Sequence, residues 1–265
     1  MIPLDYHIHT NFSRDSQALM TEMCRASIEH SILEIGFTEH FDLYPADLSY
    51  QFFQVDAWWE ELKRCRDTFR GSLNIRAGIE IGEPHLYQKA IQNMLERYPW
   101  DYILGSLHWV GTESIFGPSF FEKPEELAYQ GYFQELAEMA TQADFDIVAH
   151  MDIVKRYGFD IYGSYDPRPY EDEIRAVLRA CAERELTLEV NALTLRRSVG
   201  QASPSDEILA WFLEEGGTWV TMGSDAHKPE EVGFGLEQVM NSLQAIGFKY
   251  LARYEARQRK PHPLP

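Results

Sequence analysis

Six histidines of this chain stand in short patterns whose spacing suits metal binding. They are His7 and His9 in DYHIHT, His40 in GFTEH, His108 in GSLHWV, His150 in VAHMD and His227 in GSDAHKP. Nearly every one follows an apolar run that reads as a strand. Because histidine is the commonest metal ligand among side chains, these strand-end positions predict one polynuclear metal site.

Three carboxylates accompany these histidines. Asp15 follows DYHIHT, Asp225 stands two residues before His227, and Glu80 ends an apolar run between two isoleucines. An ionised carboxylate in such a run is costly unless it is paired or bound to metal, so Glu80 is preferred to Glu83 in the next loop. The strand period of two puts His7 and His9 on one face, and Asp225 and His227 repeat that spacing.

The elements that must position these residues alternate between strands and helices. The strand candidates are 3–8, 33–37, 73–82, 101–106, 145–149, 186–190 and 217–222. The helix candidates are 21–31, 56–69, 86–97, 124–141, 169–184, 205–214 and 229–246. Such alternation is typical of a parallel sheet with crossover helices.

Candidate ligands follow all seven predicted strands, and Asn191 supplies the position after the sixth. An open sheet would gather its site from a few adjacent strands, whereas a ring brings every carboxyl end around one point. We therefore expect an α/β fold of the TIM-barrel type, a seven-stranded (β/α)7 barrel. The chain should form a single domain over 1–265, with a peripheral tail at about 255–265.

The bulk composition excludes several classes of protein. A net charge of −18 argues against nucleic acid as a partner, and the only basic cluster, RYEARQRKPHPLP, reads as a fraying helix end. No signal peptide or membrane span is evident. Cys24, Cys65 and Cys181 are odd in number and widely spaced, as expected of reduced core cysteines in a cytoplasmic protein.

The ligand types limit the metal without identifying it. Imidazoles and carboxylates without thiolates suit Zn²⁺, Mn²⁺ or Fe²⁺. Nine candidate ligands, one of them bridging, suit three divalent ions better than one. Their charge would exceed that of Asp15, Glu80 and Asp225, which creates a local anion site in an acidic protein.

The motif set resembles the polymerase and histidinol phosphatase (PHP) family. Its motifs stand in order as DYHIHT, GIEIG, GSLHW with VAHMD, and GSDAHKP, over about residues 5–230. The TEHFDL and NALTLRR segments are most similar to the histidinol-phosphate phosphatase branch. The resemblance implies a distorted seven-stranded barrel with a trinuclear site.

The resemblance also implies a distribution of ligands. His7, His9, Glu80 and Asp225 would hold one metal, and Glu80 would bridge to a second metal held by His108 and His150. Asp15, His40 and His227 would hold the third, although many family members have histidine in place of Asp15. Asp5 and Asp152 are expected to orient the ligand histidines from behind.

A site of this kind predicts hydrolysis of a phosphomonoester. The metals would generate a bridging hydroxide as the nucleophile and clamp the phosphoryl oxygens. Asp225, His227 or a metal-bound water would protonate the leaving group. Arg197, with Arg196 second, could hold phosphate oxygens in a forked contact, unless both make surface salt bridges.

The resemblance makes L-histidinol phosphate the expected substrate, and histidine biosynthesis the expected role. Glu113 and Asp160 are the candidate partners of its ammonium group, and Tyr162, Phe116 or Trp109 could wall its imidazole. The loops at 107–123 and 155–169 suggest a covered small-molecule pocket.

Two other classes stay open at this point. One is another PHP-type phosphoesterase, acting on a different small phosphomonoester, a phosphotyrosyl protein or a nucleic-acid end. The other is a non-catalytic metal-binding module. Trp58 and Trp59 could seed a homodimer, although a buried helix face explains them better.

Overall fold

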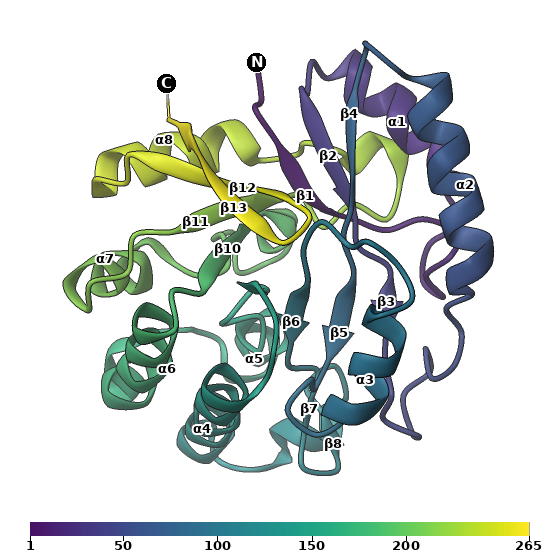
Figure 1. The fold of residues 1–265 in the computed structure, drawn as a ribbon. Coiled ribbons are helices and arrows are strands. Elements are labelled where there is room, and N and C mark those ends of the chain that lie inside the picture. The colour runs from purple at the N-terminus through teal and green to yellow at the C-terminus, as the bar shows by residue number, and fades with distance from the viewer. Residues whose placement is uncertain (265) are drawn as a thin grey trace.

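Parallel strands alternate with helices in the computed structural model, which describes residues 1–264 (Figure 1). The strands are β1 (Asp5–Ile8), β2 (Glu34–Phe37), β3 (His40–Phe41), β4 (Asn74–Ala77), β5 (Glu80–Gly82), β6 (Leu104–Ser106), β7 (Trp109–Val110), β8 (Glu113–Ser114), β9 (Ile147–Val148), β10 (Thr187–Asn191), β11 (Val220–Gly223), β12 (Tyr250–Glu255) and β13 (Gln258–Pro263). The helices are α1 (Met20–Glu29), α2 (Val55–Thr68), α3 (Gln88–Leu95), α4 (Glu125–Gln142), α5 (Lys155–Tyr162), α6 (Glu171–Glu183), α7 (Asp206–Glu214) and α8 (Leu236–Ile246).

Parallel pairing runs through the strands and returns close to its start. β1 pairs with β2, β2 with β4 and β3 with β5, and the order continues through β6, β9, β10 and β11. A single parallel bridge between Ile8 and Ala226 then joins the end of β11 to β1. The expected α/β fold is confirmed, and the carboxyl ends of these strands all face one region of the molecule.

One predicted strand is divided in two, and an unpredicted short strand follows another. The run 73–82 forms β4 and β5, separated by Gly78 and Ile79, and β3 follows β2, which corresponds to the predicted strand 33–37, after Thr38 and Glu39. Each break lets the second half pair with a different neighbour, so that β2 and β4 belong to one sheet while β3 and β5 belong to another. The division places His40 and Glu80 opposite each other in register.

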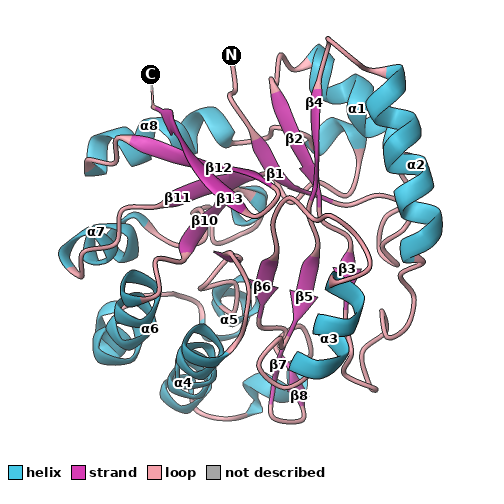
Figure 2. Cartoon of the chain, in the orientation of Figure 1, coloured by secondary structure: helices cyan, strands magenta, loops and turns pink. Residues whose placement is uncertain are grey.

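The strands are buried on both faces because helices surround them (Figure 2). All residues of β1, β2, β10 and β11 are buried, which is the usual condition of parallel strands covered by crossover helices. Among the described residues, no helix has the length and apolar character that crossing a membrane requires.

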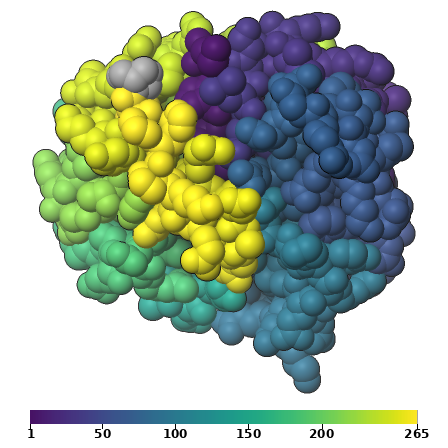
Figure 3. Space-filling model, turned by 45° about the horizontal axis from the view of Figure 1, so that its top comes forward, coloured from purple at the N-terminus to yellow at the C-terminus, as the bar shows by residue number. Residues whose placement is uncertain are grey.

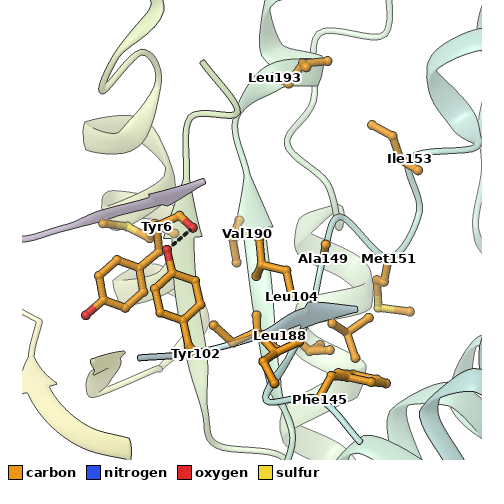
Figure 4. Close-up of a cluster of buried hydrophobic side chains, with 14 of the residues drawn as sticks. Tyr6, Tyr102, Leu104, Phe145, Ala149, Met151, Ile153, Leu188, Val190 and Leu193 are labelled. Atoms are coloured by element: carbon orange, nitrogen blue, oxygen red, sulfur yellow. Dashed lines mark hydrogen bonds between the residues drawn. The ribbon is translucent and has the colours of Figure 1, made fainter. Parts of the chain in front are cut away.

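Large buried side chains pack together beside the parallel strands (Figure 4). The rings of Tyr6 and Tyr102 stack with centroids 4.7 Å apart, and the Tyr102 hydroxyl donates to the carbonyl of Tyr6 at 2.7 Å. Leu104, Leu188 and Val190 extend this cluster, and all are buried. Because this core is apolar and closely packed, the polar side chains that could do chemistry lie at the strand ends.

The basic tail is not a fraying helix end, and that prediction was wrong. β12 and β13 form an antiparallel hairpin that adds to β11, and the C-terminal segment lies across one face of the molecule (Figure 3). Arg253 pairs with Glu34, and Arg257 with Asp144 and Asp146. The arginines of the tail therefore bind acids that stand at the amino ends of the strands.

The segments expected as long loops carry structure of their own. The 107–123 segment contains the β7–β8 hairpin, and the 155–169 segment contains α5. Trp58 and Trp59 are buried against Trp100, so they cannot seed a homodimer. A homodimer itself stays a prediction.

Candidate metal centre

Glu80 stands at the centre of the strand-end histidines. Its Oε1 lies 3.0 Å from His150 Nε2 and 3.3 Å from His108 Nε2. Its Oε2 faces three further imidazoles, with atom pairs at 3.4 Å to His7 Nε2, 3.6 Å to His9 Nε2 and 2.8 Å to His40 Nδ1. One buried carboxylate therefore divides its two oxygens between two groups of histidines.

Four overlapping groups of ligand atoms converge here, each with its atoms within 4.8 Å of one another. They are His7 with His9 and Asp225, His7 with Glu80 and His150, His40 with Glu80 and His108, and His9 with His40 and His227. Asp15 completes the outer side, with Oδ2 3.0 Å from His227 Nε2 and 3.5 Å from His40 Nε2. The structure thus brings all nine predicted ligands together, and their role as ligands stays a prediction.

Burial decreases from the inner to the outer part of the cluster. His7, His9 and Glu80 are fully buried, whereas the side chain of Asp15 is 53% exposed and that of His227 20%. The outer group is therefore the part of the cluster that faces solvent and an incoming substrate.

Strained backbone holds several of these residues in place. Asp225 has φ 52°, His150 has φ 25° and the neighbouring Glu83 has φ 44°, values that are uncommon outside glycine. Such strain persists where the surrounding structure over-determines it, and it clusters at functional sites. Gly223 is needed for another reason, because a Cβ there would lie 2.2 Å from Glu189 Oε1 and 2.4 Å from the Cβ of His7.

Hydrogen bonds behind His7 and His9 fix which nitrogens carry protons. His7 Nδ1 lies 2.6 Å from Glu189 Oε1, so it donates to that carboxylate. His9 Nδ1 lies 3.1 Å from Ser13 Oγ, which itself donates to Glu39 Oε2 at 2.6 Å. Ser13 Oγ therefore accepts from His9, and both imidazoles turn their Nε2 atoms towards the other candidate ligands.

The Nε2 atoms of His7 and His9 face each other at 3.1 Å. Carboxylate oxygens lie beside them, with Asp225 Oδ1 3.3 Å from His9 Nε2 and Glu80 Oε2 3.4 Å from His7 Nε2. Two imidazole nitrogens and two carboxylate oxygens therefore lie close together. This arrangement fits a cation, and its mixture of imidazole and carboxylate suits a divalent metal.

The carboxylates control the charge of the inner histidines. Burial alone would lower the pKa of His7, but Glu189, Asp225 and Glu80 raise it well above its ordinary value, so a bound cation would replace the Nε2 proton. Burial, with the nearby imidazoles of His227 and His40, lowers the pKa of His9 to about 3, so His9 is a neutral ligand. Burial alone would raise the pKa of Glu80, but His40 and His7 hold it well below its ordinary value. Burial raises the pKa of Glu83 to about 7, against the lowering effect of His108.

Sequence reasoning missed Glu189, although its signal was available. Glu189 is a buried acid inside the apolar strand β10, as Glu80 is inside its own run, and the same desolvation argument applies. It holds the ring of His7 and also accepts from the backbone N–H of His150 at 2.9 Å. Asn191, on the same strand, donates to Asp225 Oδ2 at 3.2 Å.

The residues expected to orient the histidines do something else. Asp5 accepts from the backbone N–H groups of Ser224 and Gly233, which fixes the loop that follows β11. Asp152 pairs with Lys155 and accepts from Ser203. The orienting contacts to imidazole rings come instead from Glu189 and Ser13.

A pocket of about 510 Å³ opens over the cluster. Its floor includes Glu80, His108 and His150, and its wall carries Arg156, Arg196, Arg197 and Lys228. Arg196 donates to the carbonyl of Asp225 at 3.1 Å, whereas Arg197 is exposed at the mouth. Arg156, from the unpredicted helix α5, was missed because its segment read as a loop.

Two predicted substrate contacts lie away from this pocket. Glu113 pairs with Lys123, and Asp160 accepts from Ser198, and neither is among the described residues of the lining. Glu231 lines the pocket, together with the cluster acids Asp15, Glu80 and Asp225. Of the three predicted aromatic walls only Phe116 lines the pocket, together with Tyr157, because Trp109 stacks on Tyr44 and Tyr162 packs on Phe121.

The sequence of this chain matches one family model and is similar to proteins named as histidinol-phosphatases. A model of the PHP domain matches residues 5–193. The histidinol-phosphatase of Lactococcus lactis subsp. lactis is 27% identical over 257 residues, covering 96% of this chain and 95% of its own. The probable histidinol-phosphatase of Deinococcus radiodurans is 27% identical over 266 residues, covering 98% of each chain.

Solved structures share the fold. A crystal structure of histidinol phosphate phosphatase from Lactococcus lactis, complexed with Zn, L-histidinol and phosphate, superposes with a TM-score of 0.89 at 23% identity and covers 97% of this chain and 98% of its own. A putative histidinol phosphatase from Listeria monocytogenes gives a TM-score of 0.77 at 20% identity, covering 89% of this chain and 99% of its own.

Proposed function

This chain belongs to the PHP domain family, and within that family we propose that it is a histidinol-phosphatase, a metal-dependent enzyme that hydrolyses L-histidinol phosphate to L-histidinol and phosphate. The observation that carries the proposal is the convergence of the His7 and His9 Nε2 atoms, 3.1 Å apart, with carboxylate oxygens beneath an arginine-walled pocket. The names and bound ligands of the similar proteins support the choice of substrate.

Three divalent ions, Zn²⁺, Mn²⁺ or Fe²⁺, are proposed for the cluster. His7, His9 and Asp225 would hold one, His108 and His150 a second, and Asp15, His40 and His227 a third, with Glu80 bridging the first two. When bound, such ions activate water at neutral pH and neutralise charge on the phosphoryl group.

The protein's own residues would bind and orient the substrate. Arg197 and Arg156, which form no ion pair with a carboxylate among residues 1–264, are suited to hold phosphoryl oxygens, and Arg196 stiffens the wall through the Asp225 carbonyl. Glu231 lines the pocket and is the proposed partner of the substrate's ammonium group. Phe116 and Tyr157 would form an apolar wall for the substrate's imidazole. Asp225 and His227, at the floor, are the proposed proton carriers for the leaving alcohol.

Partners and location follow the same reasoning. A small-molecule phosphate ester is the proposed partner, and the net charge of −18 disfavours nucleic acid. Cys24, Cys65 and Cys181 are all free and buried, which supports a cytoplasmic location. The dimer proposal loses the support of Trp58 and Trp59.

The test is phosphate release from L-histidinol phosphate by enzyme of known metal content, beside a panel of other phosphomonoesters that includes a phosphotyrosyl peptide. We expect kcat/KM for L-histidinol phosphate to exceed the others by several orders of magnitude. Slow, comparable rates across the panel would retain the phosphoesterase but reject the substrate. No turnover with metal bound would favour the non-catalytic module instead.

A further inference from the structure

Two guanidinium groups of the pocket wall have no polar partner within residues 1–264. Arg156 contacts only the ring of Tyr157, with its Cζ 5.1 Å from the ring centroid, and Arg197 contributes only backbone hydrogen bonds. Arg196 differs, because it donates to the carbonyls of Asp225 and Glu231. Free guanidiniums beside one pocket are available for an anion, but something other than the anion must hold them in place.

The two free arginines come from different parts of the chain. Arg156 lies in the first turn of α5, and Arg197 follows the 3₁₀ turn Leu193–Arg196 in the segment 191–203. That segment is closed at its base by two backbone hydrogen bonds between Asn191 and Ser203, of 2.7 and 2.9 Å. Inside it, Thr194 Oγ1 donates to the carbonyl of Gln201. Segment 191–203 therefore behaves as one unit that carries Arg197.

A buried ion pair joins this segment to α5. Lys155, adjacent to Arg156, is fully buried, and its Nζ lies 2.8 Å from Asp152 Oδ2 and 2.6 Å from the carbonyl of Ala202. Asp152 also accepts from the hydroxyl of Ser203 and from the backbone N–H of Ser205 at 3.3 Å. A second link, on the surface, runs from Ser198 to Asp160 of α5.

We propose that the Lys155–Asp152 pair is a positioning device that fixes Arg156 and Arg197 at the separation a phosphoryl group needs. The inference rests on the proposed function, because it names how that site holds its anion. Neither Lys155 nor Asp152 lines the pocket, so both act through the arginines rather than on the substrate.

The physical reason is that the two arginines repel each other before the anion arrives. Burial lowers the pKa of Arg156, and the positive charge of Arg197 lowers it further. Without a fixed scaffold, both long side chains and the segment that carries Arg197 would relax apart, and binding would have to restore their order. A pair that is buried and bonded to backbone carbonyls and amides keeps the arginines preorganised.

The test compares two variants of the metal-loaded enzyme. Asp152→Asn with Lys155→Met removes both charges at once, which avoids leaving one buried charge unpaired. Ser198→Ala removes only the surface link and should not disturb folding. The readouts are the Kd of inorganic phosphate by calorimetry, the KM and kcat for L-histidinol phosphate, and bound metal per chain.

We expect the double variant to weaken phosphate binding and raise KM by roughly tenfold, the loss of about one charge-assisted hydrogen bond, with kcat changed less than about threefold and metal content unchanged. Ser198→Ala should weaken phosphate binding by about two- to threefold. In an Arg156→Met/Arg197→Met background the double variant should have almost no further effect, because residues that act through one another are not additive.

A matched control is Glu34→Gln with Arg253→Met, which removes another largely buried pair far from the pocket and should leave phosphate affinity unchanged. Unchanged phosphate affinity in folded variants, or equal losses with and without the arginines, would overturn the positioning role. If the double variant does not fold, Ser203→Ala, which removes one hydrogen bond to Asp152, replaces it in the same phosphate measurement. Phosphate binding without turnover of the wild-type enzyme would instead reject the proposed function and leave the positioning role testable.

Discussion

Acids lie at both the amino ends and the carboxyl ends of the parallel strands, but the two sets of acids have different partners. At the amino ends, Glu34, Asp101 and Asp146 each pair with arginine, at 3.0 Å to Arg76, 2.8 Å to Arg66 and 3.0 Å to Arg257 respectively. At the carboxyl ends, Glu80 and Asp225 face imidazoles.

The two kinds of partner, guanidinium and imidazole, differ in their hydrogen-bonding capacity. A guanidinium is always charged and donates only, so an arginine–carboxylate pair is complete in itself. A neutral imidazole whose other nitrogen is already committed offers a lone pair, so a histidine–carboxylate cluster is incomplete without a cation. We therefore infer that the amino end maintains the fold and that the carboxyl end does the chemistry.

The largest expected effect comes from Glu80→Gln, which removes the charge shared by five histidines. We expect kcat/KM to fall by at least about 10²–10³-fold, the scale seen when a group that stabilises transition-state charge is lost. Bound metal, measured by mass spectrometry of the purified protein, should fall in parallel. An active variant with full metal content would contradict the central place given to Glu80.

Glu34→Ala is the counterpart at the other end. Removing Glu34 leaves Arg253 without its carboxylate and Arg76 with Glu255 alone, 3.6 Å away, and should lower the free energy of unfolding by about 3–5 kcal/mol, as measured by denaturant titration. The kcat/KM of the folded fraction should be unchanged. Loss of metal binding in this variant would erase the distinction between the two ends.

Glu189→Gln tests whether an acid that contacts a ligand histidine from behind supports metal binding. Glu189 touches His7 Nδ1 rather than the expected metal positions, and loss of such a supporting carboxylate typically costs about 10–100-fold in metal affinity or activity. Metal affinity is measured by competition with a chelating dye. An affinity equal to that of wild type would mean that Glu189 is only a core residue.

Arg197→Met removes a free guanidinium from the pocket wall. We expect KM for L-histidinol phosphate to rise by roughly tenfold with little change in metal content, because one charge-assisted contact is lost. Arg197→Lys should recover only part of the loss, since an ammonium cannot make the forked contact. Equal KM values for all three proteins would remove Arg197 from the substrate site.

The smallest effect concerns acid stability. Burial raises the pKa of Glu34, but hydrogen bonds from Arg253, Tyr6 and Arg76 outweigh it and leave the pKa below its ordinary value of 4.5. Its stabilising contribution is therefore complete above pH 4.5 and is lost as pH falls through the lowered folded value. Thermal unfolding from pH 6 down to pH 3 should show a shallower decline for Glu34→Gln than for wild type.

The sequence predicted the site better than it predicted the elements that support it. His7, His9 and Asp225 were found because strand periodicity and desolvation act locally, and Glu189 could have been found by the same reasoning. Arg156 and the β12–β13 hairpin could not. Their places depend on contacts with residues distant in sequence, such as Lys155 with Ala202 and Arg257 with Asp146.

The most direct test of the metal site at the carboxyl ends is a reconstitution titration. Metal is removed with a chelator and added back, and bound metal is measured alongside phosphate release from L-histidinol phosphate at each step. The account predicts negligible release without metal and a rate that rises with occupancy to a plateau near three ions per chain. Full activity in the metal-free protein, or failure to bind metal at all, would contradict it.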